Sequence, residues 1–120
     1  MTERQLKLLY DIKIAIDEID SYFETEAKTY ENYRTNSLLR RAVERNLEII
    51  GEAMNRLLKE DPEFTIENAV RIIGLRNQII HGYDSVSDEN IWGIVTIHLP
   101  KLELEVNSLI NKSLNLTRTV

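Results

Sequence analysis

The stretch "NSLLRRAVERNLEIIGEAMNRLLKE", residues 36–60, carries the pattern on which the fold depends. Its large apolar residues recur every three or four positions, the period of one buried helix face, and they are Leu39, Val43, Leu47, Ile50, Met54 and Leu57. We expect Asn36 or Thr35 to cap this helix, and Pro62 cannot continue it. Gly51 lies in the helix interior, where glycine costs up to about 1 kcal/mol relative to alanine, so it predicts a close helix crossing.

Two other segments show the same period. Residues 3–25 form one predicted helix, with an apolar stripe made of Leu9, Ile12, Ile16, Ile19 and Phe23. Residues 65–80 form another, capped by Thr65 and followed by Gly82, whose predicted inward residues are Ile66, Val70, Ile73 and Ile80. The intervening "TEAKTYENYRTN", residues 25–36, has no such period, and we expect it to be a linker.

The last helical segment begins at Ser87, a predicted cap, with Asp88 and Glu89 in the first turn, where the helix dipole favours acids. Pro100 interrupts it, so the remainder is either two helices or one kinked helix. Long amphipathic helices with short connections predict an all-α, antiparallel four- to five-helix bundle, and we expect residues 1–120 to form a single domain. No phosphate-binding loop, zinc-finger spacing or repeat is visible in the sequence.

Composition and charge narrow the class of protein. The chain has no cysteine and a net charge of −5, and its N-terminal apolar stretch contains acids. These features favour a cytoplasmic protein without a signal peptide or membrane span, and argue against broad, nonspecific attraction to phosphates. Residues 34–60 nevertheless hold six Lys/Arg against four Asp/Glu. This basic segment is either a solvated helix face with intrahelical ion pairs or a stripe that faces phosphates.

Chemistry-bearing side chains gather in "GLRNQIIHGYD", residues 74–84. On an ideal helix Arg76 and His81, five apart, are separated by about 140°. They converge only if the last turn frays at His81 or if a second subunit completes the site. Asn77 and His81, four apart, share a face.

These residue types suit RNA cleavage by the substrate's own 2′-hydroxyl. Histidine, with an ordinary pKa of ~6.5, can take up or deliver the proton near neutral pH. The guanidinium of Arg76 stabilises the charge that develops on the phosphorane, and Asn77 would hold either His81 or the phosphate. This reaction needs no metal ion or cofactor, and we expect none.

Structural interpretations are also open. His81 at a helix C-terminus is favoured electrostatically whatever its role, and Arg76 could pair with an acid, either Glu52 or Asp84. Glu52 is then either an ordinary surface acid or a brace for Arg76 or for a dimer. Tyr83 would be a packed ring with its hydroxyl in water.

The string "RNQIIHGY", residues 76–83, matches the R-N-x-x-x-H-x-Y signature of the HepT-like ribonuclease toxins of the HEPN superfamily, which this chain resembles. Three other segments resemble the family in the same order: "LLYDIKIAIDEID", "AVERNLEIIGEAMNRL" and "IWGIVTIHLPKLELEV". The resemblance implies an endoribonuclease in which Arg76 and His81 are the catalytic pair and Asn77 assists.

The resemblance also implies partners. Such toxins act as homodimers on RNA, as one half of a type VII toxin-antitoxin pair. Their antitoxin is an MntA-like nucleotidyltransferase that transfers AMP to the signature tyrosine, here Tyr83. The alternative function is a non-catalytic helical adaptor that serves a nucleotidyltransferase, which the acidic net charge favours.

Overall fold

Every regular element of the described chain is helical, which confirms the all-α class. The computed structural model describes residues 1–64, 66–80 and 87–118, except for the side chains at positions 69, 80 and 115–118. In chain order the elements are α1 (Glu3–Ser21), α2 (Tyr30–Thr35), α3 (Ser37–Glu60), α4 (Ala69–Ile80), α5 (Asp88–Gly93), the π-helical η1 (Ile94–His98) and α6 (Leu99–Arg118).

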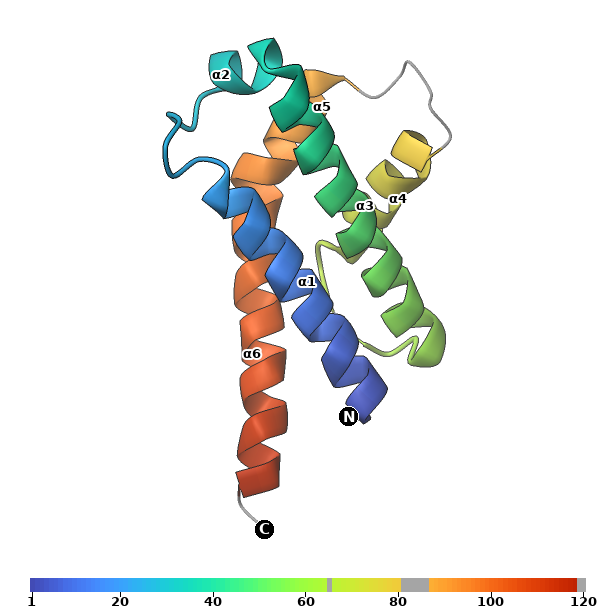
Figure 1. Ribbon diagram of the computed structural model, residues 1–120. Helices are drawn as coiled ribbons and strands as arrows, with labels where there is room; N and C mark the ends of the chain where they lie inside the picture. Colours follow the sequence, from blue (N-terminus) through green and yellow to red (C-terminus); the bar gives the residue numbers. More distant parts are fainter. Residues whose placement is uncertain (65, 81–86, 119–120) are drawn as a thin grey trace.

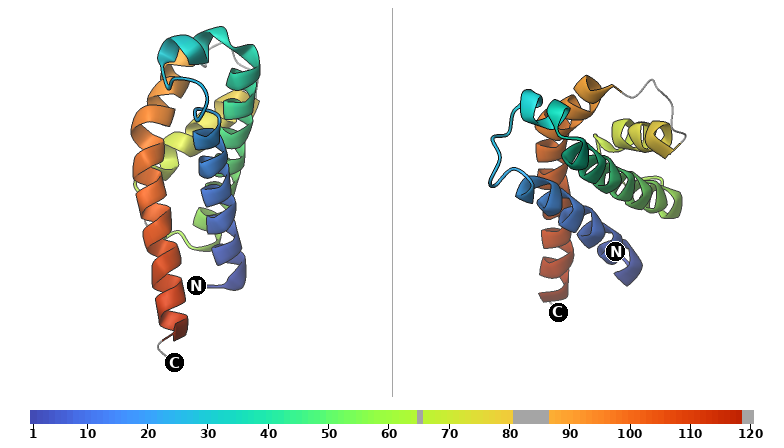
Figure 2. Two further views of the ribbon diagram at one scale, coloured as in Figure 1. Left: turned by 60° about the vertical axis from the view of Figure 1, so that its left-hand side comes forward. Right: turned by 45° about the horizontal axis from the view of Figure 1, so that its top comes forward.

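The long helices form an antiparallel bundle, as predicted. α1 packs against both α3 and α6 and runs antiparallel to each, while α4 packs on α3 (Figures 1 and 2). α3 therefore contacts α1 on one side and α4 on another (Figure 1). Burial of the apolar stripes between these helices is the main favourable term in folding. The largest fully buried side chains are Tyr33, Leu9, Ile12, Ile16, Ile19, Leu47, Ile50, Met54, Leu57, Ile72, Ile91 and Leu102.

The predictions made for the central helix are confirmed. Asn36 is its N-cap, because its side-chain oxygen accepts a hydrogen bond from the Leu39 N–H at 3.1 Å. The helix ends at Glu60, two residues before Pro62. Gly51 marks a close crossing with α4, since a Cβ on it would lie 2.5 Å from Arg76 Cβ.

Two other boundaries differ from the predictions. The first helix ends at Ser21 rather than Thr25. The expected linker contains α2, which Thr29 caps by accepting from the Asn32 N–H. A short helix forms here because Tyr33 is fully buried and stacks on Trp92 with ring centroids 5.5 Å apart, so tertiary packing compensates for the missing periodicity.

The third predicted helix has the largest error. α4 begins at Ala69, and Val70, which we expected to face inward, is 78% exposed. Ile66, before the helix, is buried as predicted and Ile73 is half-buried against the core, but the buried residues of α4 itself are Ile72 and Leu75. The side chain of Ile80 lies outside the described residues. Compared with the prediction, α4 is rotated about its axis. The side that carries Ile72 and Arg76 faces α3, because it packs against Gly51. The predicted cap, Thr65, lies outside the described residues.

The chain stays helical through Pro100. α5, η1 and α6 follow one another without a break after the predicted cap Ser87, which accepts from the Asn90 N–H. Before Pro100 the helix widens, because the Leu99 N–H donates to the Ile94 carbonyl five residues back. Proline lacks an N–H and would crowd the carbonyl four residues earlier, so a π turn is a local way to accommodate it.

Within the residues that the structure describes, no helix combines the length and apolar character that a membrane crossing requires.

Candidate functional site

Arg76 lies on the face of α4 that meets α3. Its Nη2 is 2.5 Å from Glu52 Oε2, and its side chain is 23% exposed. Of the two acids expected as partners, Glu52 is therefore the one observed, and Asp84 lies outside the described residues. The close approach is possible because Gly51, the neighbour of Glu52, has no side chain.

Asn77 holds the same guanidinium from the other side. Its Oδ1 accepts a hydrogen bond from Arg76 Nη1 at 2.9 Å. The sequence predicted that Asn77 would hold His81 or a phosphate, which stays a prediction because His81 lies outside the described residues; the contact with Arg76 was not predicted. The guanidinium is thus oriented by an ion pair with Glu52 and a hydrogen bond to Asn77, which reduces the rotamer freedom that a long arginine side chain would otherwise retain.

Glu52 is shared between two arginines. Its Oε1 accepts from Arg56 Nε at 3.1 Å, while its Oε2 faces Arg76. The hydrogen bond from Arg56 and the positive charge of Arg76 hold the pKa of Glu52 below its ordinary value, so it is ionised at neutral pH. Glu52 is a brace for Arg76, one of the interpretations that the sequence left open.

Arg76 keeps further hydrogen-bonding capacity. A guanidinium has five N–H donors. The buried Nε of Arg76 has no hydrogen-bond partner among the described residues. This Nε is enclosed by protein, but Nη1 and Nη2 each carry a second N–H beyond the one directed at Asn77 or Glu52, and these can still donate to an oxyanion.

The other half of the predicted site is His81 and Tyr83. Both lie outside the described residues, together with Gly82 and Asp84. They follow directly after α4, which ends at Ile80. Their convergence with Arg76 stays a prediction.

Arg56 was missed as a residue of this site. In the sequence, Arg56 was interpreted only as part of the basic segment 34–60, although Glu52 and Arg56 have the i,i+4 spacing of an intrahelical ion pair. The ion pair between Arg56 and Glu52 could have been predicted from that spacing. Its proximity to Arg76 depends on the α3–α4 crossing and is not visible in the local sequence.

Two further polar groups lie elsewhere in the bundle. His98 Nδ1 is 3.0 Å from Asn68 Oδ1, and Asn68 Nδ2 donates to Glu105 Oε1 at 2.6 Å, which ties the start of α4 to α6. Burial, with the charges of Arg71 and Lys101, lowers the pKa of His98 below its ordinary value. These contacts give His98 a structural role in the described part of the chain.

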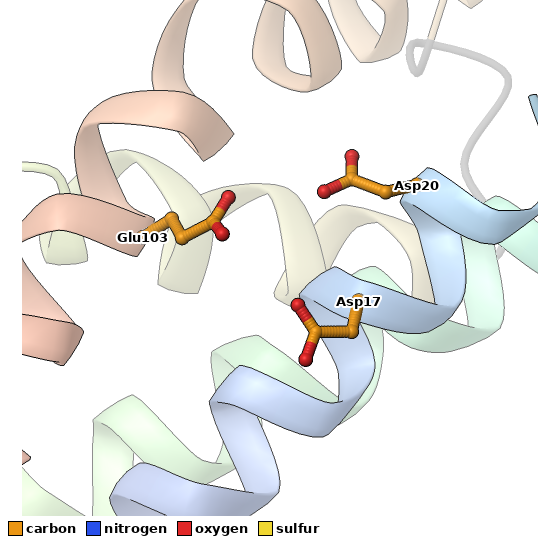
Figure 3. A group of neighbouring side chains, drawn as sticks. All are labelled: Asp17, Asp20 and Glu103. Carbon is orange, nitrogen blue, oxygen red and sulfur yellow. The ribbon is translucent and has the colours of Figure 1, made fainter.

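An acidic group lies between α1 and α6. Asp17 and Asp20 project from α1 toward Glu103 of α6 (Figure 3), and one oxygen of each lies within 4.8 Å of the others. Asp17 also pairs with Lys13 at 3.7 Å. Since the two aspartates are exposed and such acidic groups are common on protein surfaces, we assign this cluster no ligand.

Comparison with known proteins defines the class. The family model described as "Ribonuclease HepT-like" matches residues 12–109, most of the chain. The chain therefore belongs to the HepT-like ribonuclease family, as its sequence signature predicted.

Curated relatives agree with this assignment. "Putative RNase MJ1380" of Methanocaldococcus jannaschii is 35% identical over 109 residues, which cover 88% of this chain and 97% of that protein. "Putative RNase MJ0125" of the same organism is 30% identical over 112 residues, or 92% and 95% of the two chains. "Putative RNase TTE0752" of Caldanaerobacter subterraneus subsp. tengcongensis is 35% identical over 85 residues, or 70% and 76%. No solved structure gives a significant match to this chain.

Proposed function

We propose that the protein is a metal-independent endoribonuclease in which Arg76 and His81 act together on the scissile phosphate. The observation that carries the proposal is the orientation of Arg76 by Glu52 and Asn77 near the end of α4, five residues before His81 in the sequence. Membership of a ribonuclease family and relatives with RNase names support the substrate class.

The reaction is a transesterification within the RNA. The 2′-oxygen attacks the adjacent phosphorus while His81 either takes up the 2′ proton or delivers a proton to the departing 5′-oxygen, and a solvent water makes the other proton transfer. The bond between phosphorus and the 5′-oxygen breaks, which leaves a 2′,3′-cyclic phosphate and a 5′-hydroxyl. Arg76 stabilises the negative charge on the non-bridging oxygens, a role that a fixed, permanently charged guanidinium suits.

The proposed biological role is that of the toxin in a pair with an MntA-like nucleotidyltransferase. The antitoxin would transfer AMP from ATP to the Tyr83 hydroxyl and release pyrophosphate. The added bulk and negative charge beside His81 would exclude the RNA phosphate. We propose that the active form is a homodimer, because a second subunit offers one way to bring Arg76 and His81 to the same phosphate.

Cleavage of RNA in EDTA tests the enzyme proposal. We expect the wild-type protein to produce 2′,3′-cyclic phosphate ends, and Arg76→Ala and His81→Ala each to lower the rate by roughly 10²–10⁴-fold. Arg71→Ala and His98→Gln are matched controls, since they alter an arginine of the same helix and the other histidine. Wild-type activity no greater than that of the Arg76 and His81 variants would favour the adaptor function instead.

Intact mass must be measured on the same sample. A protein already carrying an adenylyl group on Tyr83 would be inactive whatever its catalytic residues. Tyr83→Phe removes the modification site, and we expect this variant to keep cleaving RNA after incubation with the nucleotidyltransferase and ATP. Inactivation of the Phe variant by the partner would contradict the role of Tyr83.

A further inference from the structure

The outward face of α3 carries a stripe of charged residues. The members recur every three or four positions, so they share one side of the helix, and they are Arg41, Arg45, Glu48, Glu52, Arg56 and Lys59. From first to last they span about 27 Å at the rise of an α-helix. We call this set the α3 stripe.

The α3 stripe is locally positive in an acidic chain. It contains four cations and two carboxylates, and all four cations are exposed, in a protein whose net charge is −5. Arg76 reaches its middle from α4 through the ion pair with Glu52. The proposed catalytic arginine is thus flanked by cations in both directions along the helix.

The ion pairs within the stripe are weak enough to exchange. Arg45 pairs with Glu48 at 3.1 Å, and its side chain is 71% exposed. Arg56 pairs with Glu52, with more than half of the arginine side chain exposed. Exposed pairs of this kind contribute little, so a phosphate can replace the carboxylate. Within the described chain, Arg41 and Lys59 at the two ends have no ion pair.

Neighbouring residues limit the positively charged surface to the α3 stripe. Arg40, adjacent in sequence to Arg41, points away and pairs with Asp88 of α5 at 3.2 Å. On the α1 side, Asp11 and Glu18 line a shallow depression with Asn46 and Ile49 of α3. These acids repel phosphates, so an RNA strand is confined to the stripe rather than spread over α1.

We propose that the α3 stripe binds the sugar–phosphate backbone of single-stranded RNA and leads it past Arg76. The inference rests on the proposed ribonuclease function and adds the path of the substrate to it. Its length matches several successive phosphates, and its arginines and lysine suit backbone contacts that carry no base specificity. Arg41, Arg45, Arg56 and Lys59 are substrate-binding residues, and Glu52 positions Arg76 between them.

Binding of an uncleavable RNA tests the proposal. The probe is a fluorescent 2′-O-methyl oligouridine of about twelve nucleotides, which lacks the attacking hydroxyl, so anisotropy reports binding whether or not the protein cleaves RNA. The stripe variant is Arg41→Gln/Lys59→Gln, which breaks no ion pair among the described residues. The control is Lys7→Gln/Arg34→Gln, which lowers net charge equally at exposed sites on α1 and α2.

We expect the stripe variant to bind the oligouridine roughly ten- to thirty-fold more weakly than the wild type near 0.1 M salt. The slope of the logarithm of the association constant against the logarithm of the salt concentration should be smaller in magnitude by about 1.4. The control should keep the wild-type affinity and slope to within about two-fold. Arg45→Gln/Arg56→Gln supplies a second test at positions nearer to Arg76.

Equal affinities and slopes for both stripe variants and the control would overturn the proposal. That result, accompanied by a changed molecular mass in light scattering for the stripe variants, would instead make the stripe a contact between protein copies. If the wild-type protein does not cleave RNA but binds the oligouridine through the α3 stripe, the proposed catalysis is wrong and the binding surface is supported. Failure of one proposal can therefore be distinguished from failure of the other.

Discussion

Gly51 and Arg76 contact each other where α3 and α4 cross. A Cβ on Gly51 would meet Arg76 Cβ at 2.5 Å and the Ile72 carbonyl oxygen at 3.2 Å. Neither is the movable end of a side chain, so the helices would have to separate. Gly51 therefore determines both how closely α4 packs and where the guanidinium of Arg76 lies relative to Glu52.

Replacement of Gly51 and of Gly74 by alanine separates the effect of close packing from that of helix propensity. We expect Gly51→Ala to destabilise the fold by roughly 1–3 kcal/mol through overpacking, which outweighs the better helix propensity of alanine. Gly74→Ala is the control, because nothing lies within 4 Å of its added Cβ, and it should stabilise the fold by up to about 1 kcal/mol. Urea unfolding measures both. Equal effects of the same sign would contradict the crossing geometry.

At the scale of elements, a buried polar contact fixes α1 against α3. Asn46 of α3 is 3% exposed, and its Nδ2 donates to the Tyr22 hydroxyl at 2.9 Å and to the Ala42 carbonyl at 3.3 Å. Tyr22 is the C-cap residue of α1. The contact therefore fixes the position of the end of α1 along α3. Apolar packing alone would specify this alignment of the two helices less precisely.

Removal of the tyrosine hydroxyl tests this contact. In Tyr22→Phe the Asn46 amide loses its shorter hydrogen bond in a buried position, which we expect to cost about 1–2 kcal/mol. Tyr10→Phe, at an exposed position of the same helix, should change stability by less than about 0.5 kcal/mol. Thermal unfolding compares the two. A Tyr22→Phe protein as stable as Tyr10→Phe would show that the hydrogen bond contributes nothing.

At the scale of the whole molecule, Glu44 of α3 lies within the electrostatic influence of Asp88 of α5, which pairs with Arg40. Burial and the negative charge of Asp88 raise the pKa of Glu44 above its ordinary value, although Arg40 partly offsets this. The folded state thus binds the Glu44 proton more tightly than the unfolded chain does. The contribution of Glu44 to stability is therefore most favourable at low pH and falls as pH rises from about 4.5 through the raised pKa.

Glu44→Gln removes this titration and keeps the side-chain shape. We expect the variant to have a higher Tm than the wild type at pH 7, where Glu44 is ionised, and a smaller difference at pH 4, where the wild-type side chain is largely protonated. Tm measured across this range gives the comparison. A difference that is constant with pH would contradict the raised pKa.

The proposed homodimer makes a separate prediction. If each site takes Arg76 from one subunit and His81 from the other, mixing Arg76→Ala and His81→Ala proteins after subunit exchange restores activity. Half of the dimers would be mixed, each with one intact site of two, so we expect up to about a quarter of wild-type activity. Light scattering verifies the dimer. A dimer that exchanges subunits without any recovery would place both residues of each site in one chain.

The sequence by itself determined the elements whose signals are local. The periods of residues 3–25 and 36–60 predicted two long helices, and Asn36 and Ser87 were identified as caps, because capping and periodicity depend on neighbours within one or two turns. Gly51 predicted a close crossing because glycine is unfavourable in a helix interior, and close contact with another helix is a reason for it to be there. The signature 76–83 predicted the family, which the comparisons confirmed.

Only the tertiary structure decided which faces and side chains meet. Val70 fits the apolar period yet is exposed, because the rotation of α4 follows from its crossing with α3. Burial of Tyr33 against Trp92 made a helix of the expected linker. Likewise Glu52 became the brace of Arg76 across 24 positions of sequence, a contact that no local pattern encodes because it depends on the distance and angle between two helix axes.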